Sequence, residues 1–456
     1  MAEESEEVIE AEELAHVLGF WHLWAIGVGA VVGDGIFLLI GEGIATAGPA
    51  AILAYLGAGM FMLFIAIGVS DLAVGLPSAG AMWIWGREIL GDYAGFVSGI
   101  SYAVGWIVAG GSVGLAIGRI TNAFFASNVM PAAYWGILFV TIFAIIQLMG
   151  VLLSGRIQLY TVLTLVGIML VFGISTMLHG DWTTERFIPF FPNGVGAVWA
   201  AMAFGMYAYM GPLTLTTAGD EVKEPSILPK ALIAASLTFL VLYTIAMVGM
   251  IGLVDWQQFS ALTSPFTETG KIVWGNIAGM VINFAAWLAA FTCLFMGTMY
   301  SAPRILWKMG DMKIIPDVFS NVWKKTKVPM FSTLFVWICS VGLILSAYYE
   351  WMDYAKLSLL LVFAWEVTWG IVLVAAVKYR MDYPDRVKGQ SWIQPLFPLF
   401  PILGMIGVII IFYGTFKGAW ISFGLGIVFL IVLTVIYFVY GKRRMDEADL
   451  PKVLEE

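Results

Sequence analysis

The chain has 456 residues, of which 61% are hydrophobic and only 12% are charged, and its mean hydropathy is +0.90. Soluble domains average about 45–50% apolar and about 25% charged residues, so this composition indicates a protein that crosses a membrane several times. Much of the formal net charge of -8 comes from an acidic start at residues 3–13, and nothing in the composition suggests nucleic-acid binding. The two cysteines, Cys293 and Cys339, both lie in apolar runs, so we expect buried thiols and no disulfide framework.

Hydropathy predicts an all-α polytopic membrane protein. Because a bilayer core takes about 20 apolar residues per helix, the apolar runs divide into twelve spans. Their approximate ranges are 20–45, 50–76, 93–122, 132–153, 157–179, 195–219, 229–254, 274–303, 330–349, 353–378, 394–415 and 418–441. The acidic start has neither the basic region nor the small-residue cleavage pattern of a signal peptide, so we expect every span to be retained.

The positively charged residues predict how the chain is oriented. Of the 23 Lys and Arg residues, eighteen fall in predicted loops on the side that carries both termini. The other five fall on the opposite side: Arg119, Arg186, Lys271, Lys356 and Lys417. Since Lys and Arg accumulate in cytoplasmic loops, we expect both termini in the cytoplasm and the protein in the plasma membrane.

Glycines crowd the first span. Gly27, Gly29, Gly33 and Gly35 fall within nine residues, together with the carboxylate of Asp34. Each glycine costs a helix up to about 1 kcal/mol relative to alanine. Close packing of helices is one explanation, but a carboxylate inside a membrane usually lines a pathway or binds a cation. We therefore predict that this helix is interrupted.

The sixth span has a comparable interruption at residues 207–212, where Gly211 precedes Pro212. Proline removes a backbone donor and clashes with the preceding turn. Spans one and six hold the same place in two successive groups of five. Interrupted helices at matching positions in two halves are the best sequence indicator of a transporter's binding site.

Four segments then resemble a known family. Residues 29–37 resemble the first-helix signature of the amino acid–polyamine–organocation permeases, usually Gly-x-x-x-Gly-(Ser/Thr)-Gly-Ile-Phe. Asp71-Leu-Ala with residues 77–80 is similar to the end of the family's second helix, and residues 219–231 to the stretch after its sixth. Residues 301–316 resemble the end of its eighth helix and the following loop. Beyond residue 330 only the hydropathy matches.

The resemblance implies a leucine-transporter-type fold of 12 transmembrane helices. These form two inverted repeats of five helices, with helices 1 and 6 discontinuous, plus two peripheral helices. The expected divisions are an acidic segment 1–17, a first repeat 18–190, a second repeat 191–380, and a last part 381–456. Family members bind the substrate between the two breaks, and by position that site falls on Val32, Gly33, Asp34, Gly35, Tyr207, Ala208 and Gly211. Tyr207 falls where related exchangers place an occluding aromatic.

Asp34 departs from the family signature, which has Ser or Thr at this position beside the substrate carboxylate. Two like charges 4 Å apart repel by about 4 kcal/mol even at an effective dielectric of 20. Three interpretations follow: the substrate lacks a carboxylate there, Asp34 is protonated when substrate binds, or Asp34 holds a bridging cation.

The coupling ion is also open. Leu213 stands where the family's sixth helix usually carries an acid, and no Lys or Arg occurs in the fifth span between Arg156 and Arg186 to fill a sodium site. Glu366, a second intramembrane acid, is a candidate with Asp34 for carrying protons. Thr292 and Thr298 in the eighth span are candidate sodium ligands, although such hydroxyls often bond to their own helix.

The sequence thus predicts a secondary active transporter that moves amino acids by alternating access, as a proton-coupled symporter or an exchanger. The alternative is an amine or polyamine permease in which Asp34 is the counter-ion of the substrate, and a channel or sensor is a third class. With three histidines and no phosphate-binding loop, we expect no enzyme, cofactor or metal site. The expected partners are the small substrate, protons or sodium, and the lipid bilayer, with no nucleic acid and no obligate protein partner.

Overall fold

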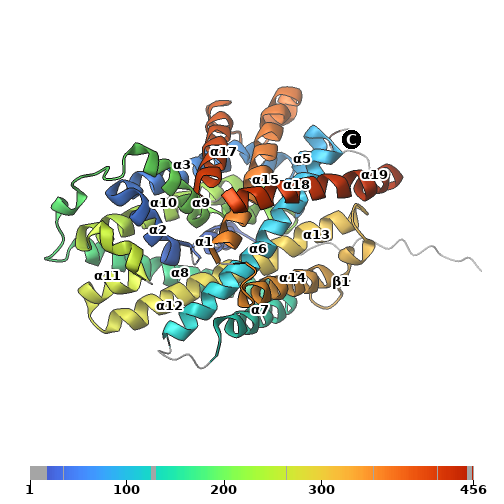
Figure 1. The fold of residues 1–456 in the computed structure, drawn as a ribbon. Helices are drawn as coiled ribbons and strands as arrows, with labels where there is room; N and C mark the ends of the chain where they lie inside the picture. The colour runs from blue at the N-terminus through green and yellow to red at the C-terminus, as the bar shows by residue number, and fades with distance from the viewer. Residues whose placement is uncertain are drawn as a thin grey trace, which may run out of the picture.

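The computed structural model describes residues 18–33, 35–124, 130–262, 264–352, 354–418, 420–448 and 454. Within these ranges the chain is almost wholly helical (Figure 1). One short hairpin supplies the sheet in this part of the chain: β1 (Val322–Trp323) pairs antiparallel with β2 (Val328–Pro329).

The first half of the chain forms ten α-helices. They are α1 (Phe20–Val31), α2 (Ile40–Ala47), α3 (Ala51–Gly68), α4 (Ser70–Gly75), α5 (Ala81–Leu90), α6 (Asp92–Phe124), α7 (Ala132–Leu148), α8 (Val151–Met177), α9 (Val195–Tyr209) and α10 (Ile227–Leu253). A π-helical segment, Gly35–Leu39, precedes α2, and 3₁₀ turns lie at Gly48–Ala50, Thr184–Phe187 and Pro212–Glu221.

The second half continues in the same way. Its helices are α11 (Pro265–Trp274), α12 (Ile277–Thr292), α13 (Ala302–Asp311), α14 (Met330–Tyr348), α15 (Tyr354–Asp382), α16 (Pro384–Lys388), α17 (Leu399–Gly418), α18 (Trp420–Ile436) and α19 (Lys442–Ala448). A π-helical segment, Cys293–Ser301, joins α12 to α13, another, Tyr437–Gly441, joins α18 to α19, and 3₁₀ turns lie at Trp256–Ala261 and Asp317–Ser320.

Nine helical stretches within the described ranges are long and apolar enough to cross a membrane. Two shorter apolar helices, α1 and α7, add to them. The protein is therefore a multi-pass membrane protein. The difference from the twelve predicted spans has a physical cause. The first, fourth and sixth predicted spans are the three not found among the nine stretches: α1 and α9 end at interruptions after 12 and 15 residues, and α7 has 17 residues. The second part of the first span, α2, runs on through a short turn into α3.

The core surrounds α6, which contacts α5, α7, α12, α14 and α15 (Figure 1). Helices α1, α3 and α8 pack against α10, and α17 packs against α3, α9 and α15. Helix α18 lies outside this core, against α15. It exposes a row of aliphatic side chains, Val428, Ile431, Val432 and Val435 among them, which suits a surface that faces lipid.

Several contacts join loops that are far apart in the chain. At one end, the backbone N–H of Leu18 donates to the carbonyl of Glu221 at 3.0 Å. At another point, Asn193 Nδ2 donates to the carbonyl of Thr46 at 2.9 Å, and Arg186 pairs with Asp255 at 3.4 Å. Each contact joins loops that the prediction places on the same side of the membrane.

Candidate functional site

The first span is broken after α1. The helical hydrogen bonding ends when the N–H of Val32 donates to the carbonyl of Val28 at 2.9 Å, and Val32 itself is extended, with φ -72° and ψ 93°. Helical structure resumes at Gly35 as a π-helix, a rare form that is frequent at functional sites. Asp34 lies outside the described residues. The predicted discontinuity of this helix is thus present between Val31 and Gly35.

The sixth span is broken after α9. Met210 is extended, with φ -65° and ψ 134°, and Gly211 has a φ of +135°. A Cβ atom on Gly211 would lie 2.5 Å from the carbonyl oxygen of Ala30, closer than any real contact. Glycine is therefore required here both by the backbone conformation and by the approach of the first break. Pro212 then opens a 3₁₀ segment in place of a continuing α-helix.

The two breaks lie against each other. Gly211 packs on the backbone of Ala30, as described above, and Gly35 packs on the sixth span. A Cβ on Gly35 would lie 2.6 Å from the ring of Tyr207 and 3.3 Å from the Cα of Ala208. The structure thus brings Gly35 of the first span together with Tyr207 and Ala208 of the sixth. At such a break, backbone amides and carbonyls that have lost their helical partners are available to a ligand.

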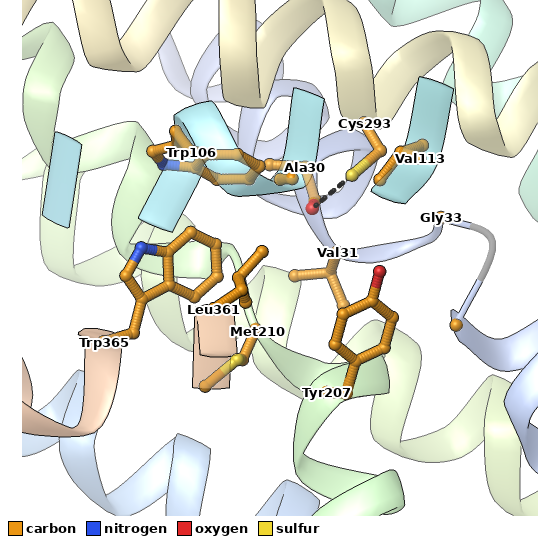
Figure 2. Close-up of a pocket in the computed structure, with 12 residues that line it drawn as sticks. Ala30, Val31, Gly33, Trp106, Val113, Tyr207, Met210, Cys293, Leu361 and Trp365 are labelled. Carbon is orange, nitrogen blue, oxygen red and sulfur yellow. Dashed lines mark hydrogen bonds between the residues drawn. The ribbon is translucent and has the colours of Figure 1, made fainter. Parts of the chain in front are cut away.

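A small cavity opens at this junction (Figure 2). Its volume is about 20 Å³, which holds about one water molecule. Of the predicted site residues, Gly33, Gly35 and Tyr207 line it, whereas Val32, Ala208 and Gly211 are not among the lining residues. The remaining lining residues are Ala30, Val31, Trp106, Ala109, Val113, Met210, Cys293, Leu361 and Trp365. In this conformation the cavity is too small for an amino acid.

Most of the lining was missed by the sequence prediction. Trp106, Ala109 and Val113 come from α6, and Leu361 and Trp365 from α15. The sequence did contain part of this information, because Trp106, Ala109 and Val113 are spaced by three, four and seven residues and so share one helix face. Such spacing predicts a buried face, but only the packing of α6 and α15 beside the two breaks makes that face part of a cavity.

Tyr207 closes one side of the cavity. Its ring lies against Gly35 of the first span, and its hydroxyl lies 3.4 Å from the hydroxyl of Ser112 on α6. The side chain is 7% exposed. Tyr207 therefore connects the first and sixth spans to α6 at the cavity.

The eighth span contacts the first break through its π-helical segment. The thiol of Cys293 donates to the carbonyl of Ala30 at 3.5 Å (Figure 2). The two candidate sodium ligands lie close by along the chain. Thr292 donates to the carbonyl of Ala289 in its own helix at 3.0 Å, and Thr298 donates to the carbonyl of Trp106 at 2.9 Å. Across the described ranges, no group of three or more His, Cys, Asp or Glu side chains is placed to hold a metal ion.

Glu366 is the other candidate for coupling. It follows Trp365 on α15 and is fully buried. Neither carboxylate oxygen has a hydrogen-bond partner among the residues that the structure describes. An ionised carboxylate in such surroundings is costly, and intramembrane acids of this kind commonly serve proton or substrate pathways.

The fold and this junction define a multi-pass membrane transporter. Comparison with known proteins agrees with that class and narrows it. The family model described as amino acid permease matches residues 22–450, and the chain belongs to this family. The family is one of transporters, so the protein is a transporter and not an enzyme.

Several curated relatives match nearly end to end. The chain is 24% identical to the uncharacterized amino acid permease YtnA of Bacillus subtilis over 463 residues, covering 96% of this chain and 98% of the relative. It is equally similar to the probable threonine/serine transporter YbxG of the same organism, covering 97% and 98%. The branched-chain amino acid permease BcaP, also from Bacillus subtilis, is 24% identical, covering 95% and 94%. These names differ in substrate, so the relatives do not identify the solute of this chain.

Proposed function

We propose that this permease carries amino acids across the membrane by alternating access, as a proton-coupled symporter or an exchanger. The observation that carries the proposal is the contact between the two interrupted helices at a cavity of about 20 Å³. Nothing larger than water fits there, so a substrate must be admitted by movement of the surrounding helices. The rocking of one half of the protein against the other around a fixed central site supplies such movement.

The proposal includes the family architecture. Twelve spans would form two inverted repeats, 18–190 and 191–380, after the acidic segment 1–17, with two further helices in 381–456. The excess of Lys and Arg in one set of loops supports cytoplasmic termini. We further propose the plasma membrane as the location.

The backbone of the two breaks would bind the charged head of the substrate. Freed amides attract a carboxylate and freed carbonyls attract an ammonium group. Val32, Gly33, Asp34 and Gly35 supply this backbone in the first span. Tyr207, Ala208 and Gly211 supply it in the sixth, and Tyr207 shields the bound solute.

Protons would be carried by Asp34, Glu366 or both. Glu366 is supported by its complete burial and by the lack of a hydrogen-bond partner among the described residues. Sodium at Thr292 and Thr298 is the weaker proposal, because both hydroxyls already bond to backbone carbonyls.

An amine or polyamine permease is the second candidate function. Asp34 favours it, since a carboxylate at the first break would pair with a substrate that has ammonium groups and no carboxylate. A channel or sensor has no need for two paired breaks, and it would show current, or no solute movement at all.

Uptake by purified protein in liposomes tests these alternatives. The panel is labelled alanine, leucine, lysine, aspartate and putrescine, each with and without an inward proton gradient, with protein-free liposomes as the control. Uptake of a zwitterionic amino acid that rises with the gradient supports symport, and uptake that requires internal amino acid supports exchange. Uptake restricted to putrescine would overturn the amino acid proposal in favour of the amine permease.

A further inference from the structure

The cavity has two ends of different chemistry. One end is the backbone of the two breaks, at Ala30, Val31, Gly33 and Gly35. The other end lies between α6, α9 and α15 and is formed by side chains: Trp106, Met210, Leu361 and Trp365 (Figure 2). Ala109, Val113, Tyr207 and Cys293 complete the lining. We expect a substrate whose head binds at the breaks to direct its side chain toward the second end, which holds the two tryptophans.

The apolar end is fixed in place by its own packing. The rings of Trp106 and Trp365 meet edge to face, with centroids 4.6 Å apart. Trp365 Nε1 donates to the carbonyl of Tyr102 at 3.1 Å, so this indole N–H is already committed within the protein. Trp106 Nε1 has no hydrogen-bond partner among the described residues, and an indole N–H can donate a hydrogen bond but cannot accept one. Met210 and Leu361 add aliphatic surface and no polar atom able to hold a charge.

No charged side chain occurs among the described residues that line the cavity. A charged group of the substrate held at the apolar end would therefore be stripped of water without gaining a counter-ion. A neutral polar group would leave at least one donor unpaired, because the indoles offer no acceptor. An apolar side chain brings no charge and no polar group of its own that needs a partner, and it gains contact with two aromatic rings.

We infer that Trp106, Met210, Leu361 and Trp365 form a side-chain subsite that selects neutral amino acids with apolar side chains. This inference rests on the proposed amino acid transport and adds the class of substrate. It treats the four residues as determinants of specificity, separate from the backbone that binds the substrate head.

Competition between amino acids of matched shape tests the subsite without changing the protein. Leucine, asparagine and aspartate have side chains of similar shape and increasing polarity, and norleucine differs from lysine chiefly in the charged amine. In liposomes that take up labelled alanine, we expect leucine to compete at least about tenfold more strongly than asparagine, and aspartate to compete least. Norleucine should likewise exceed lysine by at least about tenfold.

Substitution of a residue at the apolar end should shift the preference for leucine over asparagine. Leu361→Asn supplies an amide at nearly constant volume, and we expect the leucine-to-asparagine ratio to fall by about three- to tenfold. Leu360→Asn is the matched control, since Leu360 is its neighbour on α15 but does not line the cavity, and its ratio should not change. Met210→Ala is a second variant if Leu361→Asn fails to fold, and it should weaken competition by leucine several-fold relative to alanine.

The possible outcomes distinguish failure of the subsite from failure of the proposed amino acid transport. Uptake of amino acids with equal competition by leucine, asparagine and aspartate would overturn the subsite and leave amino acid transport intact. Stronger competition by lysine than by norleucine would also overturn it and would point to Asp34 as the side-chain partner. Uptake of putrescine with no uptake of any amino acid would overturn the transport proposal itself.

Discussion

Two buried carboxylates in this protein have opposite surroundings: one has an ion-pair partner, and the other has no hydrogen-bond partner among the described residues. Glu221, at the end of the 3₁₀ segment after the sixth span, is 1% exposed and lies 2.6 Å from the guanidinium of Arg304. The hydroxyl of Tyr300 donates to its other oxygen at 2.9 Å. Glu366, on α15, is equally buried, but neither of its oxygens has a hydrogen-bond partner among the described residues.

The difference indicates what each residue does. The Glu221 cluster is compensated, since Arg304 also donates to the carbonyl of Tyr300 at 3.0 Å and lies over the ring of that residue. It ties the sixth span to the eighth, and the backbone of Glu221 also holds Leu18 before the first span. Such a cluster stabilises one arrangement of helices. Glu366 makes no comparable contact among the described residues, and this is the basis on which we propose it for proton transfer.

Breaking the compensated pair should have the largest effect on stability. Arg304→Met leaves Glu221 buried without its counter-ion, and we expect a loss of about 3–5 kcal/mol of folding stability. Thermal unfolding of the purified protein in detergent measures it. The double variant Glu221→Gln/Arg304→Met removes both charges and should recover most of the loss. A single variant as stable as the natural protein would show that the pair is not a structural tie.

A second buried pair should give a smaller loss. Asp71 at the end of the second span is 1% exposed and pairs with Arg380 at 3.0 Å, but Arg380 is 23% exposed. Asp71 also accepts the backbone N–H of Gln394 at 2.6 Å, which would remain after substitution. We therefore expect Arg380→Met to cost about 1–3 kcal/mol in the same unfolding experiment. A loss equal to that of Arg304→Met would mean that exposure of the cation does not set the cost.

Substitution of the unpaired acid should affect stability least and coupling most. Glu366→Gln keeps the shape of the side chain and removes its ability to ionise, so we expect a change in stability within about 1 kcal/mol. If Glu366 carries the coupled proton, uptake by the variant in liposomes should no longer respond to a proton gradient. Exchange between internal and external substrate, measured without a gradient, should persist as a control. An unchanged response to the gradient would remove Glu366 from the coupling mechanism.

The sequence by itself determined the class of protein. Apolar runs long enough to cross a bilayer predicted a helical membrane protein, because a backbone in lipid must satisfy its own hydrogen bonds. The glycines around residue 33 and the Gly211-Pro212 pair predicted the two breaks, because these residue types are the least able to continue a helix. The four motif segments predicted the family, which the match over residues 22–450 confirms.

The tertiary structure decided what the sequence left open. Tyr207 became part of a junction only when the fold brought its ring against Gly35, which is 172 positions earlier in the chain. Trp106, Leu361 and Trp365 had no local feature to distinguish them from other buried apolar residues, and their role depends on which helices pack beside the breaks. Likewise, Glu221 and Glu366 are both acids in or beside apolar segments. They differ in the folded protein because Arg304 and Tyr300 lie against Glu221. Local composition predicts where a helix fails, but the chemistry of the resulting site is assembled from distant segments that long-range packing brings together.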